Sequence, residues 1–179
     1  MKFFYPNKQN DFWRIMGYIF EGNKDFFLFR DEKNEKRQLK RSQGNHQETF
    51  YDLPKIKKFL RKKKIGLSDM GQEVIRRKQN ASDAFLQITI PLNLTGILDE
   101  IPSCMMVAAA GEKAAEMAGN FLGVVPPEVG KWVDFLFHNR RMMFARLPSS
   151  SRAYPLPLEQ KAEMYRKIFE QADLMSDER

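Results

Sequence analysis

Apolar residues recur at helical spacing in three parts of the chain. Residues 10–20 carry such a stripe, which predicts a first helix. A second helix is predicted within 52–66, where Pro54 lies near the start and a basic face lies opposite the apolar one. Residues 158–172 show the same amphipathic pattern and predict a closing helix.

Shorter apolar runs predict strands and short helices in the middle of the chain. The sequence "IGLSD" at 65–69 is expected to form a strand that delivers Asp69 to its carboxyl end. The segments 82–88 and 94–101 are short helical candidates. The predicted strand would place Asp69 at the carboxyl end of the sheet, where open α/β sheets usually bind their ligands.

The C-terminal half is predicted to contain a strand, a helix and a hairpin. Residues 103–123 read as an apolar strand, a turn at Gly111 and an alanine-rich helix, which is the building block of open parallel sheets. Residues 131–146 read as two strands joined around His138 and Asn139. This alternation of strands and helices predicts one layered α/β domain, with the polar stretch 31–50 as an exposed insertion.

Composition narrows the class of protein. The 179 residues carry 30 Lys and Arg against 23 Asp and Glu, a net charge of +7. This excess fits a phosphate-backbone partner, although a basic surface that only keeps the protein in solution explains it as well. We expect no membrane partner, because the sequence has neither a bilayer-spanning apolar run nor a signal-peptide pattern.

The numbers of cysteines and histidines indicate the cellular compartment and limit the metal sites that the chain could form. The single Cys104 excludes an intramolecular disulfide framework and favours a reducing, cytoplasmic setting. It also excludes a four-cysteine iron–sulfur cluster, and two isolated histidines disfavour a zinc site. No metal and no other cofactor is predicted.

The segment "RLPSSSRAYP" is the sharpest local feature. Three consecutive serines lie between Pro148 and Pro155, directly after a predicted strand, and Arg152 adds a positive charge. Hydroxyl and backbone N–H groups bind phosphate oxygens well, so the loop is a candidate phosphate contact. The alternative is a serine turn that only leads into the last helix.

Other candidates carry structural alternatives. Asp69 could accept hydrogen bonds from a ligand, or it could cap a helix. The lysines between Lys55 and Lys64 could face nucleic acid, but such a run is usually a solvated helix face. Gly111 could admit a phosphate at the following helix, but "AAAGEKAAE" lacks the glycine spacing of a nucleotide fingerprint.

Three segments together resemble one family. "FFYPNKQNDFWRIMG", "GLSD" and "LPSSSRAY" resemble, in this order, three segments of the uracil-DNA glycosylase superfamily. The likeness is closest to its mismatch-specific and hypoxanthine-type branches. It covers nearly the whole chain and implies one domain over 1–179, a three-layer α/β/α fold with a small, mainly parallel central sheet.

The resemblance assigns roles to particular residues. Phe3 and Tyr5, with Phe4 as a neighbouring candidate, would stack against a base flipped out of the duplex, because such enzymes extrude the base they excise. Asp69 would contact the Watson–Crick edge of that base, and Asn10 would brace the aromatic loop. The DNA backbone would be contacted by Pro148, Ser149 and Ser150, with Ser151 or Arg152 at the position that pushes into the duplex.

The resemblance also implies a difference at the N-terminus. In the family a first strand and a glycine-rich loop precede the aromatic segment, and that loop carries the residue that positions the attacking water. Here this part is expected to precede Met1, which would also leave sheet edges exposed. No residue of this chain is therefore assigned as catalytic.

The functional expectation is a monofunctional, monomeric DNA glycosylase-like protein of base-excision repair. It would hydrolyse the N-glycosidic bond of uracil or of another deaminated or mismatched base, without a metal. The alternative is a catalytically inactive DNA-binding remnant. A third hypothesis is a phosphohydrolase or nucleotide-binding enzyme that uses Asp69 and the Gly111 turn.

Overall fold

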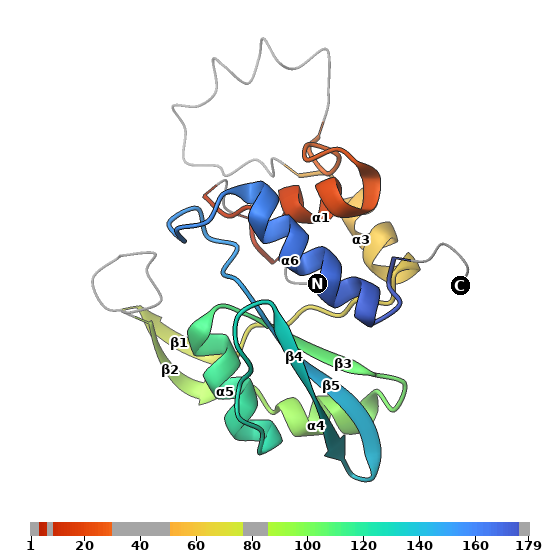
Figure 1. The fold of residues 1–179 in the computed structure, drawn as a ribbon. Coiled ribbons are helices and arrows are strands. Elements are labelled where there is room, and N and C mark those ends of the chain that lie inside the picture. The colour runs from red at the N-terminus through yellow and green to blue at the C-terminus, as the bar shows by residue number, and fades with distance from the viewer. Residues whose placement is uncertain (1–3, 7–8, 30–50, 77–85, 176–179) are drawn as a thin grey trace.

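The computed structural model of the chain describes residues 4–6, 9–29, 51–76 and 86–175. Helices and strands are interspersed along these residues, as Figure 1 shows. In chain order the elements are α1 (Phe12–Glu21), α3 (Leu53–Lys62), β1 (Gly71–Arg76), β2 (Leu86–Pro91), α4 (Leu94–Glu100), β3 (Met106–Ala110), α5 (Glu112–Leu122), β4 (Lys131–Phe137), β5 (Arg140–Leu147) and α6 (Leu158–Gln171).

Strand β5 is the centre of a three-stranded sheet with the order β3-β5-β4. It pairs in parallel with β3 and antiparallel with β4, so the expectation of a mainly parallel sheet is wrong. The reason is the tight turn between β4 and β5, which forces neighbouring strands to run in opposite directions. Its two residues, His138 and Asn139, have φ values of 46° and 65°, the left-handed pair that suits a two-residue hairpin. The strands β1 and β2 form a separate antiparallel pair.

Side chains of β5 alternate between two hydrophobic clusters. Met142 and Phe144 belong to a cluster with residues of α4 and α5, while Ala145 and Leu147 belong to a cluster with residues of α1, α3 and α6. Because successive residues of a strand point to opposite faces, this division places helices on both faces of the sheet. Figure 1 shows α1, α3 and α6 grouped together, apart from α4 and α5.

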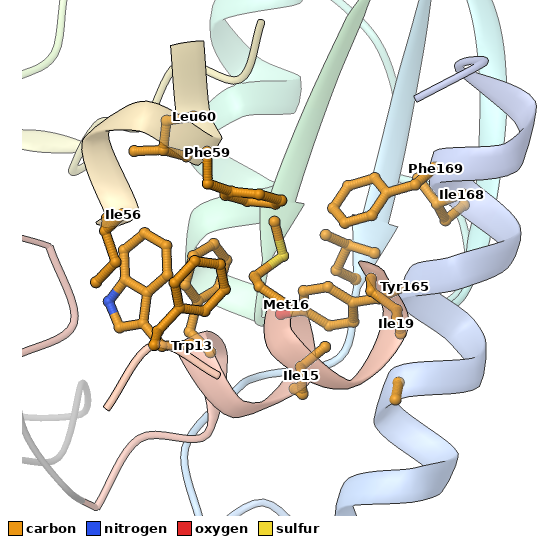
Figure 2. Packing of buried hydrophobic residues seen from close by; sticks show 14 of the residues in the cluster. Trp13, Ile15, Met16, Ile19, Ile56, Phe59, Leu60, Tyr165, Ile168 and Phe169 are labelled. Atoms are coloured by element: carbon orange, nitrogen blue, oxygen red, sulfur yellow. The ribbon is translucent and has the colours of Figure 1, made fainter. Parts of the chain in front are cut away.

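The cluster of α1, α3 and α6 is rich in aromatic rings. Trp13 packs edge-to-face on Phe27 with ring centroids 5.6 Å apart, and Phe27 packs on Phe59 at 5.0 Å. Figure 2 shows the side chains of all three helices converging on this core. Phe12 of α1 also packs edge-to-face on Tyr165 of α6, with ring centroids 6.5 Å apart, so the rings hold α1 against both α3 and α6.

Most of the predicted elements are confirmed. The helices at 12–21, 53–62, 94–100 and 158–171 are present, as are the strand-turn-helix unit around Gly111 and the β4-β5 hairpin. The predicted insertion at 31–50 lies outside the described residues. None of the helices in the described ranges is both long and apolar enough to cross a bilayer.

Two element predictions are wrong. Residues 65–69 are not a strand: Ile65 and Leu67 pack on the α1/α3/α6 cluster, but this segment pairs with none of the strands that the structure describes. The alternation of apolar residues is therefore not enough to predict a strand, because a strand also needs a pairing partner. The helix predicted within 82–88 is contradicted from Leu86 onward, where β2 begins.

Candidate nucleic-acid interface

Residues 148–155, which we call the serine loop, follow the end of β5. Pro148 and Ser150 are buried, Ser149 and Ser151 are half-buried, and Arg152 is exposed. The carbonyl of Pro148 accepts a hydrogen bond of 3.1 Å from the buried Tyr165 hydroxyl on α6. The loop therefore rests on the closing helix on one side and reaches solvent on the other.

Two of the serine hydroxyls stabilise the shape of the loop. Ser149 Oγ accepts a hydrogen bond from the backbone N–H of Ser151 at 3.3 Å, and Ser151 Oγ accepts one from Ala153 at 3.2 Å. A hydroxyl that accepts in this way still has its own proton to donate. Each of these two serines can therefore hold the loop and donate to an anion at the same time.

The serine loop pairs with the segment that precedes α1. The backbone N–H of Asp11 donates to the Ser150 carbonyl at 2.7 Å, the N–H of Arg152 donates to the Gln9 carbonyl at 2.9 Å, and Asn10 and Ser151 form an isolated antiparallel bridge. Asn10 also accepts the Phe12 N–H on its side-chain oxygen at 2.9 Å. Two segments from opposite ends of the sequence therefore form one structural unit.

The Asp11 carboxylate lies at the centre of this unit and is only 8% exposed. Its Oδ1 accepts from Arg152 Nε at 2.9 Å and lies 3.2 Å from Arg14 Nη1, and its Oδ2 lies 3.6 Å from Lys161 Nζ. We call Asp11, Arg14, Arg152 and Lys161 the Asp11 cluster. In it a single carboxylate holds three cationic side chains.

Lys161 is the least exposed of these cations. Its side chain is 1% exposed, and its Nζ donates to the Ser151 carbonyl at 2.7 Å. The ammonium also lies 6.0 Å from the centre of the Tyr154 ring. A buried charge is tolerated only when it is paired and hydrogen-bonded, and here the carboxylate and the loop carbonyl supply both.

Two buried tyrosines border the cluster as neutral phenols. Burial raises the pKa of Tyr165 far above its ordinary value, with a smaller contribution from Tyr5, while a hydrogen bond with Ser150 acts in the opposite direction. Burial also raises the pKa of Tyr51, although the charges of Arg152 and Arg14 lower it. Tyr165 therefore remains a hydrogen-bond donor to the serine loop at any ordinary pH.

The N-terminal aromatic residues lie beside the same unit. Tyr5 is half-buried and stacks on Phe12, with ring centroids 4.4 Å apart, and the Phe4 carbonyl accepts the indole N–H of Trp13 at 3.0 Å. Phe12 and Trp13 belong to the core, as expected. Phe3 lies outside the described residues. Contact of Phe3 and Tyr5 with a flipped base stays a prediction.

Asp69 does not have its expected position at the end of a strand. It is exposed and lies shortly before β1, which begins at Gly71, because 65–69 forms no strand. The Ser68 hydroxyl donates to the Asp69 carbonyl at 3.2 Å. A contact of the Asp69 carboxylate with a base remains a prediction, without the support of a strand end.

The N-terminus of α5 lies next to the serine loop. The Gly111 N–H donates to the Leu147 carbonyl at 3.0 Å, and a Cβ added at Gly111 would lie 3.6 Å from the Ser149 Cβ. Arg146 faces the same helix end, with Nη2 at 3.6 Å from Glu112 Oε1. The close approach of Gly111 fixes where the serine loop starts.

Sequence reasoning missed Asp11 and Lys161. Lys161 could have been found, because it lies three residues after Leu158 and four before Tyr165, on the apolar stripe of the closing helix. A lysine on such a stripe needs a partner. Asp11 carries no comparable signal, since its partner Arg152 is 141 residues away.

The chain matches no protein-family model, and no curated protein and no solved structure is detectably similar to it.

Proposed function

We propose that the protein is a DNA glycosylase-like protein of base-excision repair. It would bind DNA, accept a base flipped out of the duplex, and hydrolyse the N-glycosidic bond of uracil or of another deaminated or mismatched base. The corresponding fold is the three-layer arrangement of that superfamily, here with a mixed sheet. The proposal rests first on the three segments that resemble the superfamily.

One observation supports it most. Two of these segments, the aromatic segment before α1 and the serine loop, are joined by the Asn10–Ser151 bridge and by the Asp11–Arg152 ion pair. A glycosylase must hold the DNA backbone close to the place where it stacks the extruded base. Segments with these two tasks would have to be neighbours, and the aromatic segment and the serine loop of this chain are neighbours.

Charge supports a nucleic-acid partner at the same place. Arg152 and Arg14 both reach the surface, with side chains 45% and 25% exposed. The serine hydroxyls next to them supply further donors. Arginines combined with hydroxyl donors are the groups that commonly contact DNA phosphates.

The proposal is tested by base release. The purified chain is incubated with duplexes that carry one uracil, one hypoxanthine or one G·T mismatch, and abasic sites are then cleaved with alkali. A cleaved product from at least one of these substrates would support the enzymatic function. Absence of product from all of them would overturn the enzymatic function. Duplex binding without excision would instead support the inactive DNA-binding alternative.

The base-contact assignments give a variant test in the same assay. We expect Phe3→Ala and Asp69→Ala to reduce the preference for the damaged base over a normal one, because stacking and edge recognition of the flipped base would be lost. Asp134→Ala is the matched control, since Asp134 is exposed and pairs with Arg141 on the β4-β5 hairpin. Excision kinetics that are unchanged in both test variants would contradict these assignments.

A further inference from the structure

The Asp11 cluster is not electrically balanced. Asp11 is the only carboxylate of the described residues within 4.0 Å of a nitrogen of Arg14, Arg152 or Lys161. Three positive side chains around one negative side chain leave an excess of two positive charges in a partly buried place. Such an excess attracts an anion much more strongly than the same charges spread over the surface.

The geometry of Arg152 determines which of its groups can meet that anion. Its Nε donates to Asp11 at 2.9 Å, and its backbone N–H donates to Gln9. Within the described part of the chain, its two terminal nitrogens make no further hydrogen bond. The guanidinium therefore presents a free pair of N–H groups, which matches the two oxygens of a phosphate.

We infer that Asp11 is a positioning residue that holds Arg152 by its Nε so that the terminal nitrogens face a phosphate of the DNA backbone. This inference rests on the proposed function and names the part of the DNA that the Asp11 cluster receives. A guanidinium fixed before binding loses less side-chain entropy when the phosphate arrives. Lys161 supports this arrangement, because its ammonium pairs with the Asp11 carboxylate and donates a hydrogen bond to the Ser151 carbonyl.

A positioning role for Asp11 and simple charge counting predict opposite changes in DNA affinity when Asp11 is neutralised. Asp11 is negative, so its neutralisation would strengthen DNA binding if only net charge mattered. If Asp11 positions Arg152, neutralisation weakens binding instead. Asp134→Asn is the matched control, because Asp134 also accepts from an arginine, Arg141, at 2.8 Å but lies on the β4-β5 hairpin.

The experiment measures the affinity of the full chain for a fluorescently labelled duplex by anisotropy, at a fixed salt concentration. We expect Asp11→Asn to bind about three- to tenfold more weakly than wild type, the loss typical of one hydrogen bond. Asp134→Asn should bind as wild type does. A cooperative thermal unfolding transition is measured for each variant to check that it is folded. Binding by Asp11→Asn that equals or exceeds that of wild type would overturn the inference.

A second pair of variants keeps the test decisive if Asp11→Asn does not fold. Arg152→Lys retains the charge of an exposed side chain but removes the Nε and the paired terminal nitrogens. We expect a loss of affinity at every salt concentration without a change in the salt slope, because the charge count is the same. Arg141→Lys is its control. Equal affinities of Arg152→Lys, Arg141→Lys and wild type would overturn the inference.

The double variant separates positioning from general structural damage. If Asp11 acts through Arg152, Asp11→Asn should cause no further loss in the Arg152→Lys background. Additive losses of affinity in the double variant would contradict an effect of Asp11 through Arg152. Failure of wild type itself to bind the duplex would count against the proposed function, whereas wild-type binding with an unaffected Asp11→Asn variant would count only against the positioning role.

Discussion

Tyr165 holds the start of the serine loop in place. Its hydroxyl donates to the Pro148 carbonyl at 3.1 Å, and its ring belongs to the core formed by α1, α3 and α6. Because burial raises its pKa, the phenol keeps its proton in the folded state where a tyrosine of the unfolded chain would already lose it.

This difference in pKa predicts how stability changes with pH. An unfolded tyrosine releases its proton near pH 10, so above that pH the unfolded state binds fewer protons than the folded state and unfolding becomes more favourable. The Tyr165 contribution then falls by about 1.4 kcal/mol per pH unit. Urea unfolding of wild type and of Tyr165→Phe at several pH values measures the effect.

The phenylalanine variant isolates Tyr165 from other groups that titrate at high pH. Below pH 9 it should be less stable than wild type by about 1 kcal/mol, because the Pro148 carbonyl loses its donor. Above pH 10 this gap should close. A gap that stays constant from pH 8 to pH 11 would show that the pKa of Tyr165 is not raised.

At the scale of elements, β5 and α5 together define where the serine loop begins. The loop leaves β5 after Leu147, and the Leu147 carbonyl accepts the N–H of Gly111 at the start of α5. Gly111 has φ 94° and ψ 167°, a conformation that is essentially restricted to glycine. The backbone conformation at this junction therefore requires a residue without a side chain.

A substitution at Gly111 tests the importance of this junction. We expect Gly111→Ala to lower the free energy of unfolding by about 1–3 kcal/mol, the usual cost of a residue held in such a conformation. Gly66→Ala is the matched control, because an added Cβ there meets nothing within 4 Å and its φ is not in the left-handed region. Equal stability of the two variants in urea unfolding would contradict the assignment.

Local patterns predicted most elements and failed where distant partners decide. Residues that are close in sequence are enough to predict the helices α1 and α6, the Gly111 turn and the hairpin at His138 and Asn139. The segment 65–69 shows strand-like alternation, but no local signal reveals that it lacks a pairing partner among the described strands. The mixed sheet, by contrast, could have been expected from the predicted hairpin, because its tight turn makes β4 and β5 antiparallel.

The candidate site shows the same division. The serines and Arg152 are recognisable from the sequence because they are clustered between two prolines. Asp11 and Lys161 are not, because their importance arises only when the start of the chain meets the serine loop. The buried carboxylate is thus a consequence of tertiary structure and had to be found in it.

At the scale of the whole molecule, an excess of positive charge favours a DNA partner. The chain carries a net charge of +7, and the Asp11 cluster concentrates part of this excess beside the serine loop. A protein that neutralises DNA phosphates releases counterions, so its affinity falls steeply as salt is added. Both the glycosylase and the inactive DNA-binding alternative require this behaviour, whereas a basic surface that only keeps the protein in solution does not.

The most direct test is therefore the salt dependence of DNA affinity. A labelled duplex with one uracil opposite guanine is titrated with wild type, Arg152→Ala and Arg141→Ala from roughly 50 to 300 mM salt. We predict that the logarithm of the wild-type affinity falls linearly with the logarithm of salt concentration. The slope should become shallower by about one in Arg152→Ala and stay unchanged in Arg141→Ala. Absence of binding, or binding that salt does not weaken, would contradict the proposal that this protein acts on DNA.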